Sequence, residues 1–221
     1  MERRAVRAAR VRGKRRLRVS ASSWTPYRLA ERLRDALAEE GPRHIGGDEV
    51  ARPLEPARLR PAAVLIALVE RPGGPSLVLT RRAAHLKAHA GQTSLPGGRM
   101  EPEDVSAVAT ALRESEEEIG LPPDRVAVLG GLRSYDTITG FRIHPVVGWV
   151  ADPPAWRADP AEVAEIFEVP LAFVLDPANH TRESYLRDGQ RRYFYVLPHA
   201  DHYIWGATAG ILVNFARLLR A

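Results

Sequence analysis

Three glutamates close together on one predicted helix are the residues best suited to bind a metal ion or take part in catalysis. Glu114, Glu117 and Glu118 lie within the segment 102–121, PEDVSAVATALRESEEEIGL. Residues three and four apart are neighbours on a helix surface, so these carboxylates should lie on adjacent turns and repel one another. A hard divalent cation that takes oxygen ligands, Mg²⁺ or Mn²⁺, would remove that penalty. A solvated helix face has the same pattern, and the glutamates alone leave both interpretations open.

The rest of this helix is predicted to turn an apolar stripe towards the core. We expect the helix to run from about Pro102 to Ile119 and to end at Gly120, before Pro122-Pro123. On a helical wheel the three glutamates fall roughly opposite a stripe of residues spaced by three and four, namely Val105, Val108, Leu112, Ser115 and Ile119.

Two neighbouring features favour the metal interpretation. The Arg113 guanidinium could fix the orientation of one carboxylate through a bidentate contact. Upstream, Gly97-Gly98 permits positive φ angles and close backbone approach, so a main-chain group there could face a metal or a phosphate. A glycine pair alone is typical of a turn, but followed by the glutamates it indicates a binding loop.

These residues resemble the Nudix box, G-x5-E-x7-R-E-U-x-E-E-x-G-U. The matching residues are Gly98, Asp104 and the run 113–121, RESEEEIGL. Asp104 stands where the box has Glu, Ser115 replaces an aliphatic residue, and eight residues rather than seven separate Asp104 from Arg113. The extra residue is characteristic of the coenzyme A pyrophosphatase branch of the family.

The segment before the box also resembles that branch, whose pattern is L-L-T-x-R-[SA]-x3-R-x3-G-x3-F-P-G-G. In register with it stand VLTRRA at 78–83, Lys87, Gly91 and LPGG at 95–98. Lys87 in place of Arg keeps the charge but loses the planar fork, and Leu95 in place of Phe keeps an apolar contact. FEVPL at 167–171 and IWGATA at 204–209 extend the resemblance over about residues 60–220.

The resemblance implies an α/β fold, the Nudix α/β/α sandwich with a mixed sheet, and a metal-dependent hydrolase of nucleoside diphosphates linked to another group. For coenzyme A the products would be 3′,5′-ADP and 4′-phosphopantetheine. It assigns Glu114, Glu117 and Glu118 as ligands of Mg²⁺ or Mn²⁺, with Glu114 and Glu118 as the main pair. The catalytic set is Glu114, Arg113 and Glu117, in which Glu114 serves as or positions the general base and Arg113 orients it. The Gly98 region would supply a backbone oxygen.

Arg82, Lys87, Gly91 and Gln92 are the residues expected to recognise substrate phosphates, including the 3′-phosphate of coenzyme A. An ordinary basic surface loop is the alternative interpretation. Three further groups of residues carry weaker signals. His85 and His89 are spaced like zinc ligands on a helix, but no third ligand is in view. Glu162 and Glu165 are candidates for a further carboxylate from a distal loop. Trp205 and Tyr193–Tyr195 fit a hydrophobic core better than a platform for an adenine ring.

Two other functions stay open. One is a Nudix hydrolase acting on NADH, a capped RNA end or an oxidised nucleotide. The other is a non-catalytic, polyanion-binding Nudix scaffold that uses a basic arm as its contact. The intact glutamate set argues against the second, because a site without catalytic function would gain nothing from three carboxylates that repel one another.

The elements that must position these residues can be predicted from hydrophobic patterns. Strands are expected at 62–69, an apolar run typical of a strand buried on both faces, and at 77–80, 126–132, 143–150 and 191–197. Helices are expected at 27–40, 161–167 and 206–219 in addition to the glutamate helix. Strands alternating with helices indicate a mixed sheet covered on both faces.

Composition bounds the remaining possibilities. The 221 residues include no cysteine, which excludes disulfides, zinc–thiolate sites and thiol nucleophiles and is compatible with the cytoplasmic location we expect. No apolar run reaches the length of a membrane span, and the expected partner is a small-molecule substrate. The net charge of +5 is concentrated in residues 1–19, with nine Arg or Lys and one Glu, so nucleic acid could bind only through this arm. We therefore expect a basic disordered arm (1–24), an N-terminal helix with a linker (25–60) and a Nudix domain (61–221).

Overall fold

The computed structural model describes residues 24–38, 59–86, 88–187 and 189–220. Most of the predicted arm, and residues 39–58 of the predicted helix-and-linker segment (25–60), lie outside these residues. Trp24, which the expected boundary assigns to the arm, is only 9% exposed and packs in the main core. The predicted N-terminal helix is confirmed as α1 (Pro26–Ala38), and its buried Leu29 and Leu33 belong to the same core.

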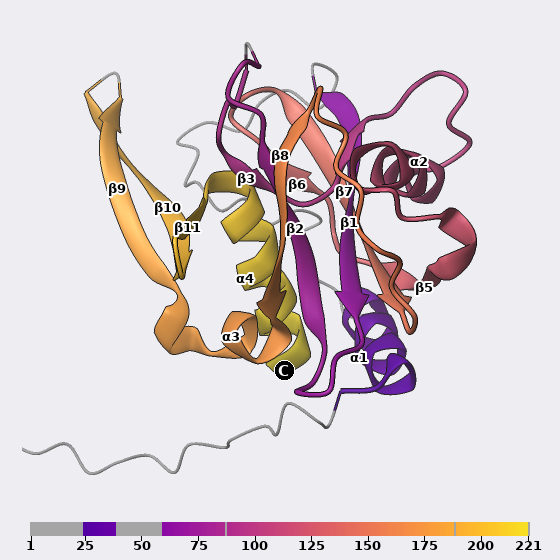
Figure 1. The fold of residues 1–221 in the computed structure, drawn as a ribbon. Helices are drawn as coiled ribbons and strands as arrows, with labels where there is room; N and C mark the ends of the chain where they lie inside the picture. Colours follow the sequence, from indigo (N-terminus) through magenta and orange to yellow (C-terminus); the bar gives the residue numbers. More distant parts are fainter. Residues whose placement is uncertain (1–23, 39–58, 87, 188, 221) are drawn as a thin grey trace, which may run out of the picture.

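A mixed sheet forms the centre of the molecule (Figure 1). The apolar run predicted to be a buried strand is β1 (Arg60–Val69), which pairs in parallel with β7 (Phe141–Val150) and antiparallel with β2 (Ser76–Arg82). The main path is β3-β2-β1-β7-β5, with β3 at Thr93–Ser94 and β5 at Ala127–Gly131. Three further strands attach to this path: β4 (Gly97–Arg99) to β1, β6 (Tyr135–Asp136) to β7 and β8 (Val163–Pro170) to β2.

Helices cover both faces of this sheet, as predicted. Alternate residues of β1 point to opposite sides, so Ala63 and Leu65 pack against α2 (Ala107–Ile119) while Ile66 and Leu68 join the core beneath α4 (Gly206–Arg220). Figure 1 shows α2 on one side of the sheet and α4 on the other, with α3 (Leu171–Leu175) beside α4. None of the described helices combines the length and hydropathy of a membrane span.

The glutamate helix begins later than its pattern indicates. The predicted start at Pro102 is wrong, because Ser106 caps α2 by accepting a hydrogen bond from the Ala109 N–H at 3.2 Å. Val105, expected on the buried stripe, precedes the helix and is 93% exposed. The predicted end is confirmed: Gly120 has φ 67° and its N–H donates to the Glu116 carbonyl, while Leu121 N–H donates to the Ser115 carbonyl.

The predicted short helix at 161–167 is wrong. Residues 163–170 form strand β8, which pairs with β2 along its length. Leu79 lies opposite Phe167, and Arg81 forms a 2.9 Å ion pair with Glu165, so long-range pairing outweighs the helical propensity of the Ala/Glu-rich segment.

A second, three-stranded sheet follows β8 and was only partly predicted. Only the middle strand, β10 (Gln190–His199), was expected; β9 (Thr181–Arg187) and β11 (His202–Trp205) flank it. Figure 1 shows the β9–β10 hairpin projecting from the body, and β11 leads directly into α4. The sheet therefore brings Trp205 to the start of the closing helix.

The core position of α1 can be tested by Leu33→Ala. Leu33 is 1% exposed, so we expect a loss of roughly 2–5 kcal/mol in the free energy of unfolding, measured by urea denaturation. Arg32→Ala, an exposed position on the same helix, is the control and should change it by less than about 0.5 kcal/mol. Equal effects of the two substitutions would contradict the packing of α1 into the domain core.

Candidate active site

The carboxylate of Glu118 is buried between α2 and the glycine strand β4. The side chain is 4% exposed, and its Oε2 accepts a 3.1 Å hydrogen bond from the Gly97 N–H. Its Oε1 lies 3.7 Å from Nη1 of Arg82. The pKa of Glu118 is raised to about 8, chiefly by burial and also by the neighbouring Glu114 and Glu162 carboxylates, while the Gly97 hydrogen bond and Arg82 oppose the rise.

Glu114 lies one turn earlier, against Gly98. A Cβ atom on Gly98 would come within 2.4 Å of the Glu114 carboxyl carbon, so a residue larger than glycine would displace this carboxylate. The side chain is 16% exposed, and its burial raises the pKa of Glu114, with the Arg113 charge acting in the opposite direction. The absence of a side chain at Gly98 therefore fixes how closely the glutamate approaches the loop.

Arg113 links the start of the helix to the glutamates. Its Nε and Nη2 donate to the two carboxylate oxygens of Asp104 at 3.1 and 3.0 Å, and Nη2 also donates to the Arg99 carbonyl at 3.2 Å. Its Nη1 lies 3.0 Å from Glu114 Oε1 and 3.1 Å from Glu117 Oε2. The guanidinium hydrogen bonds hold the pKa of Asp104 well below its usual range. The bidentate partner is thus Asp104, and Arg113 makes a single contact with each nearby glutamate.

The glutamates do not share one face opposite the core, and that prediction is wrong. Glu118 points inwards and is buried with Ser115, whereas Glu117 is 58% exposed. The Ser115 hydroxyl is satisfied within the helix by donating to the Ala111 carbonyl at 2.6 Å. A serine at this position is therefore compatible with a buried helix face, and only Glu114 and Glu118 reach the glycine loop.

The chemistry of these residues fits a hard divalent cation. Glu114 raises the pKa of the buried Glu118, and two cationic groups lie nearby: Arg82 is 3.7 Å from Glu118, and Arg113 is 3.0 Å from Glu114. Two carboxyl groups clustered in this way suit an oxygen-ligated metal ion. Within the described residues, no three His, Asp or Glu side chains converge in a geometry that would hold an ion, and Arg113 engages Glu114 and Glu117. The ligand assignment of Glu114, Glu117 and Glu118 stays a prediction.

A cavity of about 560 Å³ opens on the sheet face away from α2, beside the Gly97-Gly98 strand. Its floor includes Ala62 and Val64, which alternate along β1 with residues that face α2. Among the described residues, its polar lining contains cationic side chains, hydroxyls and an amide but no carboxylate: Arg60, Arg82, His89, Gln92, Thr93, Ser94, Arg99, Tyr135, Thr137, Thr139 and Thr208. An anionic ligand of nucleotide size would suit this lining.

Three of the five predicted substrate-binding residues line this cavity. Arg82, Gln92 and Gly98 line it. Gly91 supports the loop, with φ 70° and its N–H donating to the Arg82 carbonyl at 3.1 Å. Lys87 lies outside the described residues. The side chain of Arg82 has a buried Nε with no hydrogen-bond partner, which leaves that donor for a ligand.

Several cavity residues were missed or given little weight. Glu162 meets the site through Arg82, 3.8 Å away, whereas Glu165 pairs with Arg81 and His202 instead. Trp205, expected in the core, lines the cavity. His85 and His89 do not form a pair: His85 contacts the Ala161 carbonyl and His89 contacts Gln92. A sequence signal existed for Glu162 and Trp205, but it did not distinguish them from their neighbours.

Comparison with known proteins places the chain in a family. The NUDIX domain family matches residues 59–189, which contain the glycine strand, α2 and the cavity floor. The chain therefore belongs to the Nudix hydrolases and is a pyrophosphohydrolase. The mixed α/β fold agrees with this membership.

Curated relatives share most of their length with this chain. The protein named uncharacterized Nudix hydrolase NudL of Shigella flexneri is 41% identical over 162 residues, covering 73% of this chain and 84% of the relative. That of Salmonella newport is 43% identical over 157 residues, covering 71% and 81%. Among solved structures, the Nudix hydrolase RenU of M. smegmatis matches with a TM-score of 0.49 and 21% identity, covering 74% of this chain and 84% of that one. The Ap4A hydrolase of C. elegans matches with a TM-score of 0.44 and 16% identity, covering 50% and 80%.

The raised pKa of Glu118 predicts a pH-dependent stability in metal-free protein. The folded carboxyl holds its proton up to about pH 8 and the unfolded one only to about 4.5, so the stability contribution of this group is complete below pH 4.5 and is lost as pH rises to about 8. Glu118→Gln should therefore raise the Tm of metal-free protein at pH 9 and leave it nearly unchanged at pH 4, as measured by calorimetry. Glu116→Gln, an exposed neighbour, is the control. A lower Tm for Glu118→Gln at pH 9 would contradict the assignment.

Proposed function

We propose that this Nudix hydrolase cleaves the pyrophosphate bond of coenzyme A or its derivatives, giving 3′,5′-ADP and 4′-phosphopantetheine or its acyl form. The observation that carries the proposal is the junction between Glu118, Gly97 and the cavity. A buried carboxylate and its partner Glu114 approach one side of the glycine strand, and a cavity lined by arginines opens beside it. A diphosphate held in that cavity would lie next to the two carboxylates.

The proposed cofactor is Mg²⁺ or Mn²⁺, held by Glu114 and Glu118 with Glu117 as a further ligand. When bound, such an ion neutralises phosphate charge and lowers the pKa of a coordinated water. Burial raises the pKa of Glu114, which makes this carboxylate a better proton acceptor and suits it to receive the proton of the attacking water. Arg113, held in place by Asp104, contacts Glu114 at 3.0 Å and would keep its carboxylate oriented.

The preference for coenzyme A is supported by the loop before the glycine strand. Arg82 and Gln92 both line the cavity, and Arg82 N–H donates to the Gln92 carbonyl at 2.9 Å, so the basic segment forms one wall. This is the segment that resembles the coenzyme A branch. The NudL name of the curated relatives specifies no substrate and is compatible with this proposal.

The cytoplasmic location and the division into arm (1–24), helix with linker (25–60) and catalytic domain (61–221) are part of the same proposal. Support comes from the absence of cysteine and the concentration of net positive charge in residues 1–19.

A substrate panel tests the proposed function. Purified protein is incubated with Mg²⁺ or Mn²⁺ and coenzyme A, acetyl-coenzyme A, NADH or nucleoside triphosphates, and products are separated by chromatography. We expect 3′,5′-ADP from coenzyme A at the highest kcat/KM, and Glu118→Gln should lower that rate on the order of 10²–10³-fold. A higher kcat/KM with NADH or a nucleoside triphosphate than with coenzyme A would show that coenzyme A is not the preferred substrate. Full activity of Glu118→Gln at saturating metal would reject its role as a ligand.

Arg82→Ala separates substrate contact from support of Glu118. If Arg82 binds a substrate phosphate, KM for coenzyme A should rise about tenfold or more, because a charged hydrogen bond is lost. Arg81→Ala is the matched control, since Arg81 is not among the residues that line the cavity and pairs with Glu165. An unchanged KM with a reduced kcat would show that Arg82 acts through Glu118 alone.

A further inference from the structure

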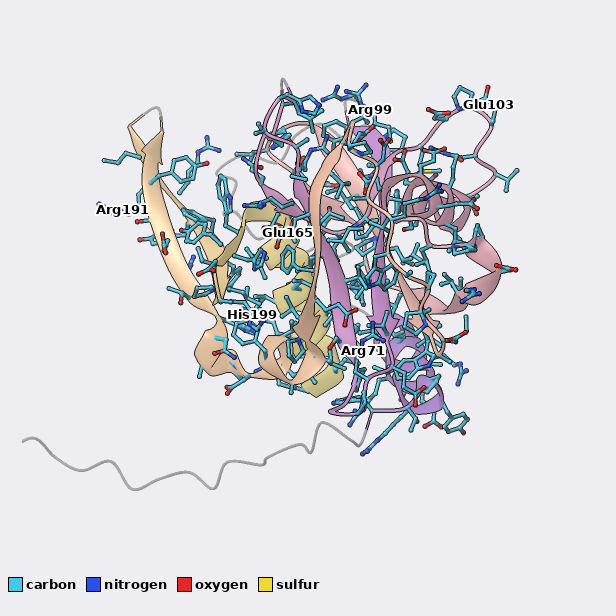
Figure 2. All side chains as sticks on the ribbon, in the orientation of Figure 1. Arg71, Arg99, Glu103, Glu165, Arg191 and His199 are labelled. Atoms are coloured by element: carbon cyan, nitrogen blue, oxygen red, sulfur yellow. The ribbon has the colours of Figure 1, made fainter. Side chains whose placement is uncertain are left out.

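Two arginines that line the cavity lie near the same aromatic ring, that of Phe141. The guanidinium carbon of Arg60 lies 4.0 Å from the centre of the Phe141 ring, and that of Arg99 lies 5.5 Å from it. Figure 2 labels Arg99 near one end of the sheet, with Arg71 at the opposite end. Neither arginine belongs to the basic segment before the glycine strand.

Strand register places these three residues on the same sheet face. Arg60 lies opposite Phe141 in the parallel β1–β7 pair, and Arg99 lies opposite Ala62 in the antiparallel β1–β4 pair. Side chains alternate along a strand, so Arg60 and Ala62 point to one side and their paired residues point there too. All of these residues line the cavity. The pairing of β4, β1 and β7 therefore brings together charges that are far apart in the sequence.

The two guanidinium groups are not committed to carboxylates within the described residues. Arg60 donates one hydrogen bond, from Nη2 to the Thr139 carbonyl at 3.3 Å, and Arg99 uses its backbone carbonyl to accept from Arg113. By contrast, Arg82 lies within 4 Å of both Glu118 and Glu162. The charge at Arg82 is therefore partly compensated, while Arg60 and Arg99 face a cavity to which none of the described residues contributes a carboxylate.

We propose that Arg60, Arg99 and Phe141 form a second anion subsite, which binds an anionic group of the substrate lying outside the scissile diphosphate. The inference rests on the proposed function, and it predicts a substrate class: diphosphates whose nucleotide carries a further phosphate. Stacking on the ring restrains each guanidinium and leaves its planar edge free to donate hydrogen bonds to phosphate oxygens. Lysine would supply the charge without this geometry.

The experiment compares ligands that differ only in the additional phosphate. Kinetics use coenzyme A and 3′-dephospho-coenzyme A; metal-free calorimetry uses 3′,5′-ADP and 5′-AMP. The variants are Arg60→Gln, Arg99→Gln and the double substitution. Arg182→Gln is the matched control, because Arg182 is also exposed and stacks on Tyr193 at 4.3 Å, but lies on the projecting hairpin and does not line the cavity.

We expect wild-type protein to bind 3′,5′-ADP at least about tenfold more tightly than 5′-AMP, and the KM of dephospho-coenzyme A to exceed that of coenzyme A by a similar factor. Each substitution should reduce these ratios severalfold, the double variant should bring them close to one, and Arg182→Gln should leave them unchanged. A wild-type ratio near one, or a ratio that persists in the double variant, would overturn the proposal. If no coenzyme A is hydrolysed, the proposed function fails, and the calorimetric ratio still decides whether the subsite exists.

Discussion

The buried carboxylate of Glu118 is the interaction on which the arrangement of the site depends. It lies at the point where α2 packs against the glycine strand, and the backbone N–H of Gly97 hydrogen-bonds to it directly. Burial of a carboxylate is costly without a full set of partners, and the raised pKa of Glu118 expresses this cost. The Glu118 carboxyl therefore links helix α2 to the glycine strand. Its burial is understandable if a cation binds next to it.

Around that carboxylate, the sheet separates the face that carries the glutamate helix from the face that carries the cavity. Residues of β1 that point to one side pack against α2 and support the glutamates, while those that point to the other side form the cavity floor. The glycine strand runs between these compartments: Gly98 accommodates Glu114, and Gly97 has φ 148°, where an added Cβ would meet the backbone of β1. Gly98 therefore leaves room for the Glu114 carboxylate, and Gly97 allows β4 to lie close to β1.

Much of the fold followed from local patterns. The apolar run 62–69 indicated β1, and Gly120 indicated the end of α2, because both signals depend on nearby residues. Predictions were wrong where a distant partner or a local hydrogen bond decided the outcome. Pairing with β2 makes residues 163–170 a strand, and the Ser106 cap delays the start of α2. The two outer strands of the second sheet, β9 and β11, were also not predicted. Each is stabilised by pairing with β10.

The sequence by itself determined the family, the identity of the glutamates and glycines, and the basic character of the loop before them, because spacing along the chain carries this information. Tertiary structure alone decided that Glu118 is buried while Glu117 is exposed, that the bidentate partner of Arg113 is Asp104, and that Arg60, Arg99 and Phe141 meet on one wall. The physical reason is that burial and cross-strand register depend on which elements pack together, and no local spacing specifies that.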